Sequence, residues 1–555
     1  MNILKCLYNQ RIPMRDGVQL SADIYFPEEE PPYYVLLIRT PYDSTSDLRI
    51  NFNKFYTDKG YCVVLQDVRG RGDSDGIFSP WIQEENDSCD TIKWISKQSW
   101  CKDKSVAMTG GSYHGFVQWE AAKTSLPELK AIAPAVIGHD RFKDGMCING
   151  IFCLIGYTWQ MNCSGRSVQH HINTADERIL STLPIKDLDK AAGCNVSFYQ
   201  ESLKHPVADD YWQKTRLDNF YKNINIPVFI TGGWYDKYAA GCFKNFMGIK
   251  KYGGETARKA SRIIIGPWNH STIFINSRHL GCIDFGKGRM LNPLELEEKW
   301  LAQWFKNENS KTTEEQKAVT IFLMGENTWR EETDWPLPDT QYKKMFLASS
   351  GRANSLFGDG KLNWNMKSMS DKDTYIYNPE NPVPALGSTA TLSATPEDQR
   401  PVEKRDDVLV YTSEALKSPL EITGFVNLEL YAASSAVDTD FFAKFCDVHP
   451  DGRSINLSEG IIRARFKEGL DREVMMQPGK VYLFKIEIGV TSILFKHGHR
   501  IRLEISSSCF PAYFRNLNTG EPFATGTKIK IAEQTIYPSA ACPSCLILPV
   551  IPRSH

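Results

Sequence analysis

The sequence lacks a long apolar run. No stretch of about 18 residues, the length that indicates a membrane helix, is apolar throughout. Residues 1–10 also lack the apolar core and the small-residue cleavage site of a secretory signal. We therefore expect a cytoplasmic protein that has no membrane partner.

An excess of charge of one sign is missing as well. Lys and Arg total 65 against 66 Asp and Glu, so the formal net charge is -1. A nucleic-acid partner is not expected, because binding to phosphates depends on a basic surface. With 42% apolar and 24% charged residues, the composition is that of a globular protein, and a small, weakly charged substrate fits it best.

Cysteine pairs are scarce. The 14 cysteines are scattered, and Cys542 and Cys545 form the one pair with Cys-x-x-Cys spacing. A zinc site normally needs two such pairs, or one pair with histidines nearby. We therefore expect reduced, mostly buried cysteines, no metal and no organic cofactor.

The first half of the chain alternates between buried strands and helices. Continuous apolar runs at residues 34–38, 61–66, 106–109 and 129–136 are typical of strands covered on both faces of a parallel sheet. Helical periodicity occupies residues 83–98 between two of them. This alternation predicts an α/β fold.

Two changes of pattern divide the rest of the chain. Aromatic residues and helical periodicity without a clear strand, from about residue 140 to 225, predict an inserted helical cap. Short alternating runs beyond about residue 343 predict a β sandwich or jelly roll. The expected domains are a catalytic α/β domain (1–139 and 226–342), a helical cap (140–225) and a jelly-roll domain (343–555).

Residues 105–122 predict a nucleophile elbow. An apolar run leads into glycines, then Ser112, and then a helical pattern. The sharp turn needs residues without a Cβ where the chain is crowded, which fits Gly110, Gly111 and Gly115. A glycine-serine cluster alone can also be an ordinary turn. Whether this one is a nucleophile elbow depends on finding the other catalytic groups.

A base and an acid follow Ser112 at the ends of later strands. The apolar run that starts at residue 226 ends in glycines before Asp236, and the run from residue 262 ends before His270. Serine, acid and histidine in this order are the arrangement of an α/β-hydrolase triad, in which histidine takes the serine proton and the acid orients histidine. Asp209 and Asp210 are rival acids, but they fall in the cap.

An acyl transfer also needs donors for the oxyanion. The N–H of Tyr113, directly after the nucleophile, is one expected donor. Tyr42, after the first buried run, offers a hydroxyl, although a loop tyrosine without a catalytic role fits the residues equally well.

In the acidic, glycine-rich loop 67–76 we expect Arg69 and Arg71 to pair with Asp67, Asp73 or Asp75.

Six motifs together resemble the cocaine esterase family, also called the CocE/NonD hydrolases, which is related to the X-Pro dipeptidyl-peptidases. They are Arg-Thr-Pro-Tyr (39–42), Asp-Val-Arg-Gly-Arg-Gly (67–72), Gly-Gly-Ser-Tyr-His-Gly (110–115), Gly-Gly-Trp-Tyr-Asp (232–236), Gly-Pro-Trp-Asn-His (266–270) and Asp-Gln-Arg-Pro (398–401) with Asp-Val-Leu-Val-Tyr (407–411). The resemblance spans nearly the whole chain. It implies an α/β-hydrolase fold with a helical cap and a jelly-roll domain.

The resemblance also assigns roles to residues. It implies Ser112 as nucleophile, Asp236 and His270 as its partners, and Tyr42 with the Tyr113 amide as oxyanion hole. His114 is a departure, because relatives often have an apolar residue there. Lys237 and Tyr238 stand where α-amino-acid ester hydrolases carry acids that hold the substrate amine, so a charged-amine substrate is disfavoured.

The sequence thus predicts a serine hydrolase that cleaves a small-molecule carboxylic ester through an acyl-enzyme. Amide cleavage, as an amidase, acylase or X-Pro dipeptidyl-peptidase, is the alternative that uses the same residues, and a sugar-binding protein with an inactive hydrolase domain is the alternative from another class. We expect Trp159, Trp234 and Tyr238 to line the substrate pocket. A homodimer through the β domain is a further expectation.

Overall fold

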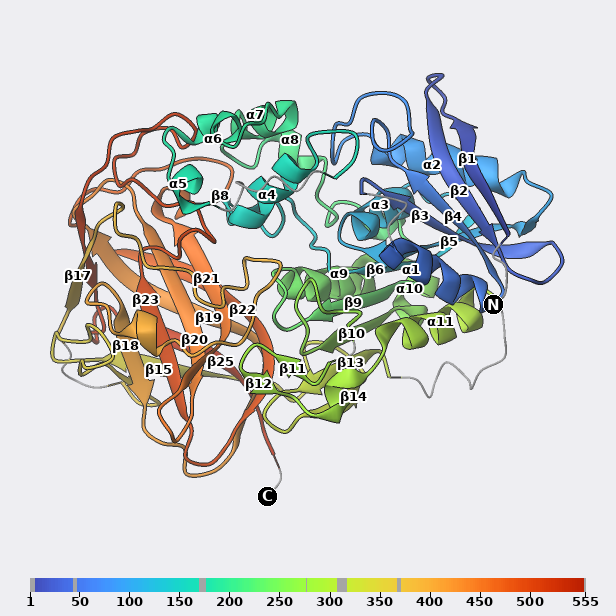
Figure 1. The fold of residues 1–555 in the computed structure, drawn as a ribbon. Coiled ribbons are helices and arrows are strands. Elements are labelled where there is room, and N and C mark those ends of the chain that lie inside the picture. Colours follow the sequence, from blue (N-terminus) through green and yellow to red (C-terminus); the bar gives the residue numbers. More distant parts are fainter. Residues whose placement is uncertain are drawn as a thin grey trace.

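The computed structural model describes residues 5–42, 47–168, 176–275, 277–306, 317–366 and 371–553. Two large sheets dominate it, and Figure 1 shows the α/β part in blue and green beside the all-β part in orange and red. Within the described ranges, no helix is long and apolar enough to cross a membrane.

The first sheet has ten strands in the order β1-β2-β4-β3-β5-β6-β9-β10-β13-β14. The strands from β4 to β13 run parallel, and antiparallel strands close both edges. The bounds are β1 Lys5–Pro13, β2 Gln19–Phe26, β3 Tyr33–Thr40, β4 Tyr61–Asp67, β5 Cys101–Gly111, β6 Leu129–Ala135, β9 Phe229–Gly233, β10 Arg262–Gly266, β13 Val319–Leu323 and β14 Thr328–Glu332.

Helices cover both faces of this sheet. On β3, Val35 and Leu37 pack into one apolar cluster, whereas Leu36 and Ile38 pack into another, because successive side chains of a strand point to opposite faces. The first cluster includes residues of α2, α3 and α9, and the second includes residues of α1 and α11. The helix bounds are α1 Asp47–Thr57, α2 Glu84–Ser96, α3 Tyr113–Ala122, α9 Ala239–Tyr252, α10 Glu255–Ala260 and α11 Pro293–Trp304.

The predicted cap segment has helices as its main regular structure. It contacts the α/β domain where Arg71 donates to the Cys163 carbonyl and the β domain where Arg515 donates to the Ser181 carbonyl. Its helices are α4 Leu154–Asn162, α5 Glu177–Leu180, α6 Leu188–Ala191, α7 Ser197–Leu203 and α8 Asp210–Gln213, with short 3-10 turns at Ile185–Asp187 and Tyr221–Asn223. The expectation that it contains no strand was wrong in detail, since Cys147–Ile148 (β7) pairs with Ile151–Phe152 (β8). In Figure 1 these helices lie across the top of the molecule, between the two sheets.

The C-terminal domain is an eleven-stranded antiparallel β structure with one parallel pair, β16 with β18. Its strands are β15 Gln341–Ala348, β16 Lys361–Asn363, β17 Asp373–Tyr377, β18 Leu409–Ser413, β19 Leu420–Ser434, β20 Asp440–Val448, β21 Ser454–Arg463, β22 Tyr482–Phe495, β23 Arg500–Ser506, β24 Ala532–Ile536 and β25 Cys545–Ile551. Short helical elements in its described residues are α12 Arg400–Glu403 and the 3-10 turn Ala464–Phe466. β15 begins just before residue 343, the predicted start of this domain.

The two sheets are joined by backbone hydrogen bonds. Met324, directly after β13, donates to the carbonyl of Ser492 over 3.0 Å and accepts from the N–H of Leu494 over 2.8 Å. The small elements β11 His279–Leu280, β12 Ile283–Asp284 and the 3-10 turn Lys287–Met290 lie in the segment between β10 and α11. All 14 cysteines are free and most are buried, as the sequence predicted.

Candidate active site

Ser112 lies at the tip of a strained turn between β5 and α3. Its backbone has φ 60° and ψ −125°, a conformation that L-residues rarely adopt and that turns at functional sites retain. Gly110 has φ 123°, and a Cβ on it would lie 2.6 Å from the Cβ of His114. A Cβ on Gly115 would lie 3.0 Å from Ile137, whereas on Gly111 the nearest atom is 3.3 Å away. The crowding expected at the elbow is therefore greatest at Gly110.

Asp236 and His270 are brought together by the turns after β9 and β10. His270 Nδ1 lies 2.7 Å from Asp236 Oδ2, and the Asp236 side chain is fully buried. The second carboxylate oxygen, Oδ1, accepts a hydrogen bond from the N–H of Tyr238 over 2.6 Å. A carboxylate can only accept here, so Nδ1 carries the proton and Nε2 of the neutral ring is left as a base.

In the described part of the chain, no hydrogen bond joins Ser112 and His270. Ser112 and His270 are both partly exposed, and they follow β5 and β10, whose carboxyl ends lie at the same edge of the parallel sheet. Catalytic hydrogen bonds are often long before substrate binds. The structure thus places both at the edge where an α/β sheet carries its ligands.

The β domain holds the loop that carries His270. Asn269 donates from Nδ2 to the carbonyl of Ala394 over 2.8 Å, and the Ser271 hydroxyl donates to the carbonyl of Leu392 over 3.1 Å. Both neighbours of His270 are therefore anchored to the same β-domain segment. Local sequence patterns carry no signal for this contact, because the partners are more than a hundred positions apart.

Tyr42 lies where the cap meets the end of β3. Its hydroxyl oxygen accepts a hydrogen bond from Nε1 of Trp159 in α4 over 2.9 Å, and its N–H donates to the Thr40 hydroxyl over 3.1 Å. Trp159 was predicted to line the pocket. The structure adds a contact to the expected oxyanion tyrosine that sequence reasoning missed.

The Tyr113 side chain is buried and anchored. Its hydroxyl donates to Oε1 of Glu84 over 2.7 Å, and its ring stacks on Trp159 with centroids 5.5 Å apart. Burial, reinforced by the nearby Glu84 carboxylate, raises the pKa of Tyr113 well above 10. The N–H of Tyr113 is the first of α3, and the first N–H groups of a helix have no carbonyl within the helix to bond.

The expected partners were wrong for Arg69, and Arg71, which lies near enough to Asp67 to be attracted by it, makes its hydrogen bonds elsewhere. Arg69 pairs with Asp16 over 2.7 Å and with Asp87 over 2.6 Å. Buried Arg71 donates to two carbonyls, Pro41 over 2.7 Å and Cys163 over 2.8 Å. Both arginines therefore bond groups that folding brings close to them rather than acids that are close in sequence. Arg71 consequently joins the residue before Tyr42 to the end of the cap helix α4.

The other two predicted pocket residues lie close to Asp236. Trp234 is 1% exposed, and its Nε1 donates to the carbonyl of Phe322 over 2.8 Å. Tyr238 is 8% exposed, and its ring centroid lies 5.6 Å from that of His270. Lys237 between them is partly buried and donates to the carbonyl of Gly145. A pocket role for Trp234 and Tyr238 stays a prediction.

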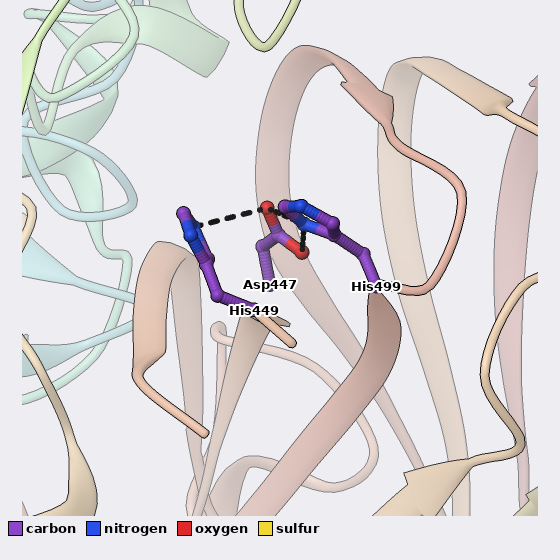
Figure 2. Close-up of side chains that lie close together, drawn as sticks. All are labelled: Asp447, His449 and His499. Carbon is purple, nitrogen blue, oxygen red and sulfur yellow. Dashed lines mark hydrogen bonds and ion pairs between the residues drawn. The ribbon is translucent and has the colours of Figure 1, made fainter. Parts of the chain in front are cut away.

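Two groups of potential metal ligands occur among the described residues, both in the β domain. In the first, shown in Figure 2, His499 Nδ1 donates to Asp447 over 2.8 Å, and His449 Nε2 lies 3.6 Å from the same carboxylate. Burial lowers the pKa of His449 below 6.5. The Asp447–His499 hydrogen bond satisfies these two groups without an ion.

The second group is Glu403, Cys446 and Glu504, all buried. Burial raises the pKa of the Cys446 thiol and of the Glu504 carboxyl, so both favour the protonated form. Metal binding needs thiolate and carboxylate ligands. The expectation that the protein uses no metal or cofactor stays a prediction.

Comparison with known proteins covers nearly the whole chain. Residues 16–272 match the X-Pro dipeptidyl-peptidase (S15) family, and residues 311–547 match the X-Pro dipeptidyl-peptidase C-terminal non-catalytic domain. The cocaine esterase of Rhodococcus sp. (strain MB1 Bresler) is 36% identical, with 98% of each chain aligned.

Solved structures agree over the same length. An aminopeptidase from a marine sediment archaeon, Thaumarchaeota archaeon, superimposes with a TM-score of 0.87 at 25% identity, covering 99% of this chain and 97% of its own. An α-amino acid ester hydrolase gives a TM-score of 0.85 at 25% identity, covering 99% and 96%. A CocE/NonD family hydrolase from Staphylococcus aureus shares the fold at 18% identity, with a TM-score of 0.73 and coverage of 99% and 94%.

Proposed function

Since the chain belongs to the cocaine esterase-like (CocE/NonD) hydrolases of the X-Pro dipeptidyl-peptidase family and is a serine hydrolase, we propose that it cleaves carboxylic esters of small molecules through an acyl-enzyme. The observation that carries the proposal is the 2.7 Å contact between His270 Nδ1 and buried Asp236. It fixes the tautomer in which Nε2 can accept a proton.

In the proposed reaction Ser112 is the nucleophile. Its Oγ attacks the acyl carbon while His270 Nε2 takes the hydroxyl proton, and the imidazolium is stabilised by Asp236. His270 then gives this proton to the oxygen of the leaving alcohol. Water, deprotonated by the same nitrogen, releases the acid and restores Ser112.

The tetrahedral intermediate needs two donors aimed at its oxyanion. The Tyr113 N–H at the start of α3 is one proposed donor. The hydroxyl of Tyr42 is the other, and its contact with Trp159 supports this role. An oxygen that accepts one hydrogen bond becomes a stronger donor through its own hydrogen, because neighbouring hydrogen bonds polarise one another.

Amide cleavage is the second candidate, and the similarity to a solved aminopeptidase favours it. Recognition of a free amino group in this chain would need an acid near the triad. The residues after Asp236 are Lys237, whose ammonium group is committed to Gly145, and Tyr238. This arrangement supports the ester as the preferred substrate over a peptide with a free amine.

The test is hydrolysis of p-nitrophenyl esters of short-chain and aromatic acids by the native chain and by Ser112→Ala. Ester cleavage that disappears in the variant supports the proposal, and matched p-nitroanilides give the ratio of ester to amide cleavage. If the native chain cleaves anilides but no ester, the amidase takes its place. If a phosphonate also fails to label Ser112, the serine is not a nucleophile and the proposal is wrong.

A further inference from the structure

The side chain of His114, two residues after Ser112, joins two parts of the proposed site. It is 4% exposed, Nδ1 lies 2.7 Å from the carbonyl oxygen of Gly111, and Nε2 lies 3.0 Å from Oγ1 of Thr40. Gly111 is the last residue of β5 before the nucleophile, and Thr40 is the last residue of β3 before the loop that carries Tyr42. These parts belong to neighbouring strands of the sheet.

The direction of each hydrogen bond follows from the chemistry of its partners. A carbonyl oxygen can only accept, so His114 Nδ1 carries the hydrogen. In the neutral ring Nε2 is then an acceptor, which the Thr40 hydroxyl can serve as donor. The Thr40 oxygen in turn accepts from the N–H of Tyr42 over 3.1 Å. We call the chain of hydrogen bonds from the Tyr42 N–H through Thr40 and His114 to the Gly111 carbonyl the His114 relay.

Two further interactions surround His114. Gln118, one helical turn later, donates to the carbonyl of Gly110 over 2.9 Å, so α3 holds the last two carbonyls of β5 with side chains at positions i and i+4. The ring centroid of Tyr42 lies 5.2 Å from that of His114. The close approach of the His114 Cβ also explains why residue 110 has to be glycine.

From these contacts we propose that His114 is a positioning residue, which sets the place of the Tyr42 loop relative to Ser112 and thereby aligns the two halves of the oxyanion hole. The proposal rests on the function proposed above. It gives a role to the residue in which this chain departs from the motif that the sequence resembles. In this role His114 neither transfers a proton nor contacts the acyl group. Its loss should therefore weaken transition-state stabilisation indirectly, by displacing Tyr42.

The experiment compares variants that remove the relay with variants that retain part of it. His114→Leu and Thr40→Val each remove the link, whereas Thr40→Ser keeps a hydroxyl at the same place. His114→Gln places an acceptor near the position of Nε2, and His114→Asn places a donor near that of Nδ1. The two amides thus separate the contact with Thr40 from the contact with Gly111.

We expect His114→Leu and Thr40→Val to lower kcat about tenfold each while KM changes less than about twofold. The double variant should be no slower than the worse single one, because both remove the same link. Thr40→Ser should stay near the native rate, and His114→Gln should recover more activity than His114→Asn. Equal kcat in the native chain and His114→Leu, or additive losses in the double variant, would overturn the inference.

A second readout separates this inference from the proposed function. The rate at which a p-nitrophenyl phosphonate labels Ser112 also depends on the oxyanion hole, but it does not require that the natural substrate is an ester. If the native chain is not labelled, the proposed function fails. If it is labelled and His114→Leu, with an unchanged melting temperature, is labelled at the same rate, His114 has no positioning role and the proposed function stands.

Discussion

The indole N–H of Trp159 donates to the hydroxyl of Tyr42 over 2.9 Å, although 117 positions separate the two residues in sequence. Trp159 lies in α4 of the predicted cap, and Tyr42 follows β3 of the catalytic sheet. The same Trp159 ring stacks on Tyr113. One side chain of the cap therefore contacts both residues proposed to supply the oxyanion hole.

Tyr42→Phe should slow acylation by about two to three powers of ten, because one oxyanion donor is removed. Pre-steady-state release of p-nitrophenol measures this step. The variant should melt close to the native temperature, since only one hydroxyl of a partly exposed side chain is lost. An unchanged acylation rate would remove Tyr42 from the site.

Trp159→Phe should give a smaller loss, about tenfold in kcat, because the donor to Tyr42 is lost while an aromatic ring still stacks on Tyr113. Trp212 makes the same kind of hydrogen bond, from Nε1 to the His205 carbonyl over 2.9 Å, and its ring contacts Phe142 and Tyr211, so Trp212→Phe is the matched control. If both tryptophan variants lose activity equally, the Trp159–Tyr42 hydrogen bond has no specific effect.

Asp236→Asn should lower kcat by about four powers of ten, because an amide N–H facing Nδ1 of His270 favours the wrong tautomer. The N–H of Tyr238 still has an oxygen to bond if the amide oxygen takes the place of Oδ1, so we expect the fold to survive. Circular dichroism and the melting temperature check this point. Activity within tenfold of the native chain would show that Asp236 is not the acid of the triad.

Gly110→Ala should destabilise the elbow and abolish most activity. The new Cβ would meet the Cβ of His114 at 2.6 Å, and φ 123° is unfavourable for alanine, at a cost of roughly 1–3 kcal/mol for the backbone strain alone. Gly111→Ala is the matched control, because its nearest contact is 3.3 Å and its φ is not positive. Melting temperatures and ester hydrolysis of both variants should differ in this order.

Buried Glu297 in α11 should make stability depend on pH. Its Oε1 accepts from the Tyr56 hydroxyl over 2.7 Å, and burial raises the pKa of Glu297 from 4.5 to about 7. The folded chain therefore keeps a proton that the unfolded chain releases above its own pKa. The contribution of Glu297 to the free energy of unfolding is greatest below about pH 4.5. It falls by about 3 kcal/mol in total as the pH rises to about 7.

Glu297→Gln removes this titration. The variant's melting temperature, relative to the native chain, should rise between pH 5 and pH 8, values that flank most of the window. Glu295→Gln, at a partly exposed position on the same helix, is the control for removing a carboxylate from α11. A constant difference between Glu297→Gln and the native chain over this range would contradict the raised pKa.

Much of the fold could be predicted from local patterns. The buried runs became strands of a parallel sheet, and helices are the main regular structure of the described cap residues. Gly110 and Gly115 marked the crowded positions of the elbow, because a sharp turn imposes its demands on the residues that form it. The placement of Asp236 and His270 after consecutive strands was also readable, since parallel strands bring their carboxyl ends to one edge of the sheet.

Local patterns did not predict which groups each side chain bonds. Arg71 had acids close in sequence, yet it bonds the Pro41 and Cys163 carbonyls. Asn269 reaches Ala394, 125 positions away in the β domain. Composition and periodicity describe which face of an element is buried, but they do not say which other element covers it.

Local residue patterns were enough to predict the order of strands and helices, the elbow at Ser112 and the candidates for acid and base, because these depend on residue types within a few positions of one another. The packing of distant elements was needed to show that Trp159 bonds Tyr42, that His114 joins the loop after β3 to the end of β5, and that a β-domain segment holds the His270 loop. Such contacts depend on how separate elements pack, and a hydrogen bond forms only where packing brings donor and acceptor within about 3 Å of each other.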